Sequence, residues 1–65
     1  MVMNAYSILI ETAEGAPTRQ WLNYAGDAEA VADWLPRSAG KRVEIMTEGR
    51  VVAAWDEREP AGQAA

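Results

Sequence analysis

The stretch KRVEIMTEGRVVAAWD, residues 41–56, carries the clearest pattern in this sequence. Two runs of alternating side chains flank a turn that contains Gly49. Alternation with a period of two is typical of half-buried strands, because successive side chains point to opposite faces of a sheet. The stretch therefore predicts a β-hairpin, and the rest of the chain is expected to complete a small sheet around it.

The turn decides which side chains of the hairpin share a face. A three-residue loop, residues 47–49, needs two ordinary residues followed by one in the left-handed region, which a glycine suits. It pairs Ile45 with Val51 and Val43 with Ala53, and we prefer it because its core face is the more apolar. The core face then carries Val43, Ile45, Val51, Ala53 and Trp55, and the outward face carries Glu44, Met46, Val52 and Ala54.

A two-residue loop at positions 48 and 49 is the alternative. It pairs Ile45 with Val52 and Val43 with Ala54. Its first position would need a positive φ or a type II′ turn, and neither suits Glu48.

Two further strands are predicted ahead of the hairpin, at residues 5–12 and 19–24. The core-facing side chains of the first are Tyr6, Ile8 and Ile10. In the second, Trp21 points away from Leu22 and Tyr24, so either of its faces can be buried.

A short helix is predicted between the two pairs of strands. Asp27 is a suitable N-cap, and Pro36 should end the helix near Leu35. The apolar stripe expected to face the sheet consists of Ala28, Val31, Ala32 and Leu35. Together the elements predict an α+β fold: a four-stranded antiparallel sheet in the order ββαββ, with one helix on one face.

The 65 residues form one small domain, predicted over residues 1–56, and residues 57–65 are expected to be a disordered tail. Because the chain has no cysteine, packing or a partner must supply its stability. Residues 1–10 lack the features of a signal peptide, and no apolar run is long enough to span a membrane. We therefore expect a cytoplasmic protein.

The residue types exclude most catalytic designs. There is no histidine, no cysteine, and no phosphate-binding or calcium-binding loop, so the sequence predicts no enzyme, no cofactor and no metal. Glu29 and Asp33 lie four residues apart on one helix face, where two carboxylates repel one another. A solvated helix face is the ordinary interpretation, and a partner-binding acidic pair is the functional one.

Composition favours a protein as the partner. The net charge of −4 argues against direct binding of nucleic acid or membranes and favours a larger, basic protein. Three tryptophans and two tyrosines supply side chains that dominate interfaces, although burial in the core is an equally good interpretation for some of them. The candidate partner-binding residues are Glu29, Asp33, Glu44, Asp56, Trp21, Trp34 and Tyr24.

The element order resembles that of small anti-CRISPR inhibitors encoded by phages and mobile elements. The resemblance lies in the first strand, AYSILIE (5–11), the short helix, GDAEAVADWL (26–35), and the closing hairpin, RVEIMTEGRVVAAW (42–55). It implies a non-enzymatic inhibitor that docks on a basic nucleic-acid-binding surface of a Cas protein or complex. The resemblance concerns element order and length, so no site residues are carried over from it.

A second hypothesis is a homodimeric structural or accessory protein of a phage or bacterium. The outward face of the sheet is predicted to be half apolar, which is typical of an association surface. A second copy on that face, or along an edge strand, would compensate for the small core.

Overall fold

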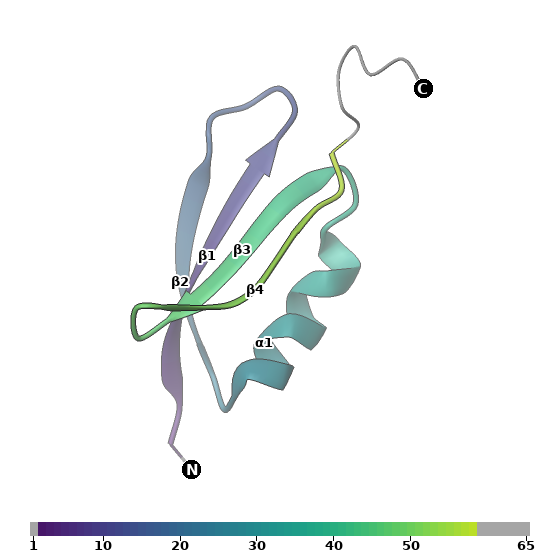
Figure 1. The fold of residues 1–65 in the computed structure, drawn as a ribbon. Coiled ribbons are helices and arrows are strands. Elements are labelled where there is room, and N and C mark those ends of the chain that lie inside the picture. Colours follow the sequence, from purple (N-terminus) through teal and green to yellow (C-terminus); the bar gives the residue numbers. More distant parts are fainter. Residues whose placement is uncertain (1, 59–65) are drawn as a thin grey trace.

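The computed structural model describes residues 2–58 (Figure 1). The elements are β1 (Asn4–Thr12), β2 (Thr18–Tyr24), α1 (Asp27–Trp34), a short 3-10 helix η1 (Leu35–Arg37), β3 (Lys41–Thr47) and β4 (Arg50–Asp56). The four strands form one sheet in the order β2-β1-β3-β4, with every neighbouring pair antiparallel. Helix α1 packs on one face of this sheet, so the predicted α+β fold and ββαββ order are confirmed.

The core lies between α1 and the two central strands. Its buried members are Tyr6, Ile8, Tyr24, Ala30, Trp34, Val43 and Ile45. The core-facing side of β1 is the one that alternation predicted, because Tyr6 and Ile8 are buried and Ile10 packs against them.

The register of β2 removes the ambiguity of that strand. Leu22 lies opposite Tyr6, and Tyr24 lies opposite Asn4. Residues directly opposite one another in an antiparallel pair share a face, so Leu22 and Tyr24 belong to the core side. Trp21 therefore points to the uncovered face.

The predicted three-residue turn is wrong. Thr47 pairs with Arg50, which leaves a two-residue loop of Glu48 and Gly49. Both loop residues have positive φ, 52° at Glu48 and 77° at Gly49. This is the pattern of a type I′ turn, whose twist matches that of the flanking strands, and the hairpin adopts it although Glu is a poor residue for the left-handed region.

A bulge in β4 then changes the register. Met46 pairs with Val51, but Ile45 pairs with Ala53, so Val52 is the extra residue. The expected pairs of Ile45 with Val51 or with Val52 are therefore both wrong. Because the bulge adds one residue to β4, the residues after Val52 return to the faces that the three-residue turn predicted. Ala53 and Trp55 therefore still lie on the core face. Val52 packs against the core, whereas Val51 is 53% exposed, the reverse of the predicted assignment.

The helix begins one residue earlier than predicted, and its buried stripe shifts with it. Gly26, in extended conformation at φ −168°, is the N-cap, and Asp27 is the first helical residue. Trp34 is buried at 4% exposure and Leu35 is 53% exposed. The predicted stripe is wrong at Ala28, Ala32 and Leu35, which are exposed; Ala30, Val31 and Trp34 pack on the sheet instead.

The first residues of the predicted tail contact the domain. The backbone N–H of Glu57 donates to the carbonyl of Lys41 at 2.8 Å, and the Arg58 side chain lies 2.7 Å from the carboxylate of Asp56. The rest of the predicted tail, residues 59–65, lies outside the described residues.

The turn provides a test of this geometry. Replacing Glu48 with Asn should raise the free energy of unfolding by about 0.5–1 kcal/mol, because Asn tolerates positive φ and Asn-Gly is the preferred type I′ pair. Urea unfolding followed by circular dichroism measures this change.

The neighbouring position supplies the opposite change. Gly49→Val should lower the free energy of unfolding by more than about 1 kcal/mol, because a β-branched residue fits poorly at positive φ. Gly26→Ser is the matched control, since the backbone there is extended and an added Cβ has nothing within 4 Å. A Glu48→Asn variant less stable than the parent would contradict the type I′ turn.

Candidate functional site

The face of the sheet opposite α1 is not covered by any element of residues 2–58. We call it the outer face. Its central part consists of Ser7, Leu9, Glu11, Arg19, Trp21, Arg42, Glu44, Met46, Val51, Ala54 and Asp56. The strand register arranges these side chains in three rows that cross the sheet.

The first row is aromatic and apolar. Ser7 on β1 lies between Trp21 on β2 and Met46 on β3, and Val51 follows on β4. Trp21 is 68% exposed, although tryptophan side chains are highly buried on average in folded proteins.

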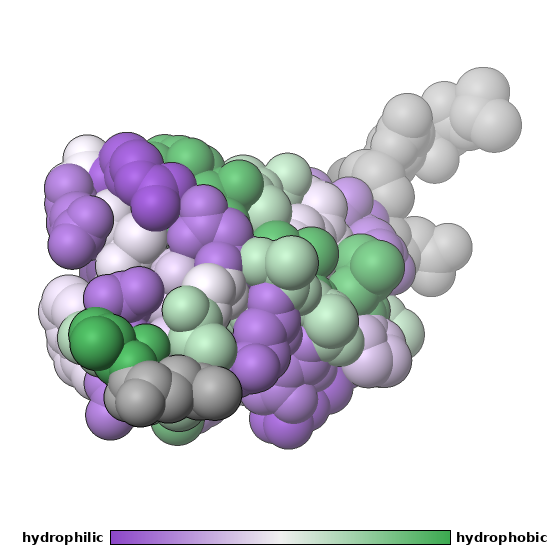
Figure 2. All heavy atoms as spheres, turned by 90° about the horizontal axis from the view of Figure 1, so that it is seen from below, coloured by the Kyte–Doolittle hydropathy of each residue, from purple (hydrophilic) through white to green (hydrophobic). Residues whose placement is uncertain are grey.

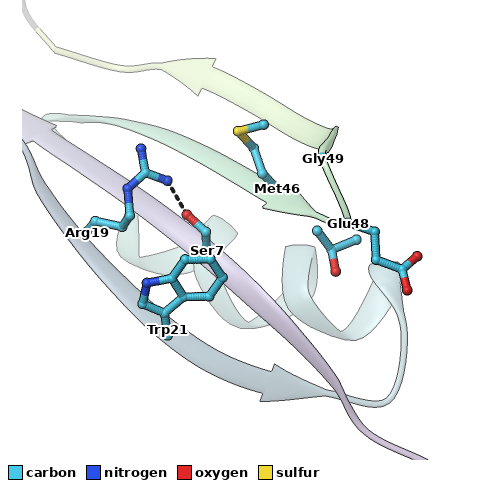
Figure 3. Close-up of a pocket in the computed structure, with 7 residues that line it drawn as sticks. Ser7, Arg19, Trp21, Met46, Glu48 and Gly49 are labelled. Carbon is cyan, nitrogen blue, oxygen red and sulfur yellow. Dashed lines mark hydrogen bonds between the residues drawn. The ribbon is translucent and has the colours of Figure 1, made fainter.

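A shallow hollow of about 200 Å³ opens between Trp21 and Met46. Figure 3 shows both side chains standing on the same side of the sheet, with α1 behind it. Ser7 forms the floor and is itself buried, and the guanidinium of Arg19 donates a hydrogen bond to its hydroxyl (Figure 3). The hollow extends to the β3–β4 turn, where Glu48 and Gly49 line it.

The second row carries opposite charges on its two sides. Leu9 on β1 lies between Arg19 on β2 and Glu44 on β3, and Ala54 follows on β4. Strands β2 and β3 are separated by β1, so the backbones of Arg19 and Glu44 lie about 10 Å apart. Neither of them takes part in any of the ion pairs found within residues 2–58.

The third row is an ion-pair ladder. Arg42 donates to Glu11 at 2.9 Å, and Asp56 lies opposite Arg42 on β4. Arg58 joins the two acids, at 2.7 Å from Asp56 and 3.5 Å from Glu11. Hydrogen bonds from the side chain and the backbone of Arg58 lower the pKa of Asp56 from 3.8 to about 2.

On the helix side, one tyrosine joins the sheet to the start of α1. The Tyr6 hydroxyl donates to the Asp27 carboxylate at 2.7 Å, and Arg50 on β4 holds the same carboxylate with two hydrogen bonds of 3.0 and 3.3 Å. The Arg50 guanidinium, followed by the Tyr6 hydroxyl, lowers the pKa of Asp27. The hydrogen bond to Asp27 in turn raises the pKa of Tyr6.

A second tyrosine does the same at the other end of the helix. The Tyr24 hydroxyl donates to Asp33 at 2.5 Å and accepts from the indole N–H of Trp34 at 2.9 Å. Arg37 donates to Asp33 at 2.8 Å and stacks over the Trp34 ring, with its guanidinium carbon 4.9 Å from the ring centre. Burial, followed by the bond to Asp33, raises the pKa of Tyr24. These bonds hold α1 on the sheet.

The structure separates the seven predicted partner-binding residues into three groups. Trp21, Glu44 and Asp56 lie on the outer face. Glu29 lies on the exposed surface of α1, where its carboxylate accepts from the backbone N–H of Ala25 at 3.2 Å. The remaining three, Tyr24, Trp34 and Asp33, bond to one another in the cluster that attaches α1.

Sequence reasoning missed Arg19 as a member of the candidate site. Only the pairing of β2 with β1, which places Arg19 opposite Leu9, shows that Arg19 lies on the outer face. Alternation alone left the orientation of β2 open, so the outer face was predicted without any contribution from that strand.

Two other kinds of site, a metal centre and a membrane-spanning helix, are absent from the described part of the chain. Within residues 2–58, no group of three acidic, histidine or cysteine side chains gathers closely enough to hold a metal ion. No helix in this range has the length and apolar character needed to cross a bilayer. At the end of the molecule seen in Figure 2, hydrophobic residues are interspersed with strongly hydrophilic ones.

Comparison with known proteins gave no match among protein-family models, curated protein sequences or solved structures.

The ion-pair ladder predicts a pH dependence. The pKa of Asp56 in the folded protein, about 2, lies below its ordinary value of 3.8, so ionised Asp56 favours folding. This contribution is present above about pH 4 and disappears as the pH falls toward about 2. A carboxyl titration by NMR should give a midpoint near 2 for Asp56.

The control is Arg58→Gln, which removes the charged donor and should return the midpoint toward 3.8. In Asp56→Asn, the acid-induced fall in the urea midpoint should be smaller than in the parent. An unchanged titration in Arg58→Gln would show that the contact between Arg58 and Asp56 does not form in solution.

Proposed function

We propose that the chain is a non-enzymatic, cytoplasmic protein-binding module and that it binds through the outer face. One observation carries the proposal: the helix covers one side of the sheet, while the other side presents Trp21 at 68% exposure above a hollow. Removing a side chain of this size from water on binding contributes about 1.5–3 kcal/mol.

The chemistry of the outer face suits a protein partner. Trp21, Met46 and Arg19 are of the residue types enriched at protein interfaces, and Trp and Arg are prominent among hot spots. They stand on strands β2 and β3 of one sheet rather than on loops, so the positions of their backbones are set before binding and little backbone entropy is lost.

The outer face suits nucleic acid poorly. Aromatic side chains on a sheet can stack bases, but such sites also need a basic groove that follows the phosphate backbone. Here the net charge is −4, and Arg42 is bonded to Glu11. We therefore propose no direct nucleic-acid partner, no membrane partner and no cofactor.

The narrower form of the proposal is an anti-CRISPR inhibitor that places its acids on a basic surface of a Cas protein. The candidate acids do not gather on one face: Glu29 lies on α1, Glu44 lies on the outer face, and Asp33 and Asp56 are each bonded to an arginine. This arrangement favours docking through the apolar row, with the net charge steering a larger basic partner at long range. A plaque assay on a host with active CRISPR immunity tests this form.

A homodimeric structural or accessory protein is the second candidate function. The observation that favours it is the second row, in which Arg19 and Glu44 occupy the two sides of Leu9. Because this row carries one positive and one negative charge, each charge can pair with the opposite charge of a second copy. A row with charges of one sign would need a partner of the opposite charge.

Site-specific photo-crosslinking tests the binding face. A photoreactive phenylalanine analogue placed at position 21 should yield a discrete covalent adduct with a protein in the cells that produce the chain. The same analogue at position 32, an exposed site on α1, is the control and should yield none. Equal labelling from both positions, or no adduct from position 21, would contradict the proposed binding face.

A further inference from the structure

We infer that the occupant of the outer face is a second copy of this chain, packed face to face about a twofold axis that runs along β1. This inference rests on the proposed function and names the partner of the same face. It is carried by the order of side chains in the first two rows.

The second row pairs opposite charges under this symmetry. A rotation of 180° about a line parallel to β1 generates a second copy whose outer face lies against that of the first. Strand β2 of each copy then faces strand β3 of the other. Arg19 and Glu44 flank Leu9 at the same height on these two sides. Each Arg19 therefore faces Glu44 of the other copy, which gives two ion pairs per dimer around the two Leu9 side chains near the axis.

The first row pairs an aromatic with a thioether side chain under the same rotation. Trp21 and Met46 flank Ser7, the next residue along β1 that lies on the outer face. Each Trp21 therefore faces Met46 of the other copy, and a thioether beside an aromatic ring is a favourable contact. The small Ser7 side chain leaves the hollow of about 200 Å³ near the axis, where the opposing side chains can interdigitate.

The separation of the two sheets suits these contacts. Stacked sheets pack about 10 Å apart with their strands aligned to within about 30°. The Arg19 guanidinium rests on the Ser7 hydroxyl within one chain, and by turning away from the sheet it can reach a glutamate across such a gap. Within one chain Arg19 and Glu44 are held apart by β1, so the second copy supplies the ionic partner that each lacks among residues 2–58.

The third row is compatible with the symmetry. Glu11 follows Leu9 on the outer face of β1, so the two copies of Glu11 approach one another near the axis. Arg42 at 2.9 Å and Arg58 at 3.5 Å neutralise each of them within its own chain. The net charge of −4 on each copy opposes association at long range, but salt screens this repulsion beyond about 8 Å at physiological ionic strength.

Sedimentation equilibrium of the full chain, up to about 1 mM, tests the inference. The parent chain should reach twice the 7.1 kDa of one copy. Arg19→Glu and Glu44→Arg should each weaken the dimer by about tenfold or more, because each places like charges opposite one another. The double variant should restore the parent affinity, since it exchanges the two ends of both ion pairs.

The design separates pairing from net charge. The two single changes shift the net charge in opposite directions, and the double variant keeps the parent value of −4. Glu29→Arg on α1 is the matched control for Glu44→Arg and should leave the dimer unchanged. Thermal unfolding of each variant verifies that it is folded.

A chain that stays monomeric over the whole concentration range overturns the inference. A dimer that the double variant fails to restore also overturns it, because the pairing of Arg19 with Glu44 is then wrong. If the purified chain is monomeric while position 21 still crosslinks to a different protein, the second copy is excluded and the proposed binding face stands. If position 21 yields no adduct, the proposed function itself fails.

Discussion

The hydrogen bond from Tyr6 to Asp27 is the contact on which the arrangement of the protein depends. Tyr6 lies on a central strand, and its ring packs edge to face against Tyr24, with the ring centres 5.6 Å apart. Its hydroxyl reaches the first residue of α1, and Arg50 on the edge strand β4 holds the same carboxylate. One carboxylate thus joins a central strand, an edge strand and the helix. A buried hydroxyl without such a partner would destabilise the core, so the bond adds to the apolar packing that holds α1 on this side of the sheet.

The functional consequence of this arrangement is an unequal sheet. Tyr6 and Tyr24, together with Trp34, bring the large aromatic side chains and their hydrogen bonds to the helix side. Helix α1 has eight residues and covers one side of the sheet. No other element within residues 2–58 covers the second side. Trp21 is left there, beside Arg19 and Met46, on a rigid surface formed by adjacent strands. The proposed binding function and the proposed twofold dimer both follow from this asymmetry.

Much of the fold could be predicted because alternation and helix signals are local. The strands, the single helix, the end of the helix near Pro36 and the core face of β1 all follow from side-chain patterns within a few residues. The turn was mispredicted because the twist of the hairpin, and not the preference of Glu48, selects positive φ at both loop positions. The helix stripe was mispredicted because Asp27 bonds to Tyr6 and Arg50, residues far away in the sequence. These contacts turn the face of α1 that carries Asp27 toward the sheet, and Ala30, Val31 and Trp34 lie on that face.

By itself the sequence determined the number and type of elements, the acidity of the chain and the lack of histidine and cysteine chemistry. These properties depend on residue identity and on spacing along the chain. Only the tertiary structure decided which strands are neighbours, that Val52 is a bulge, and which tryptophan is buried. The physical reason is that strand register is a long-range property: it places Arg19 and Glu44 on either side of Leu9, although the three residues are far apart in the chain. The candidate site therefore exists only in the assembled sheet.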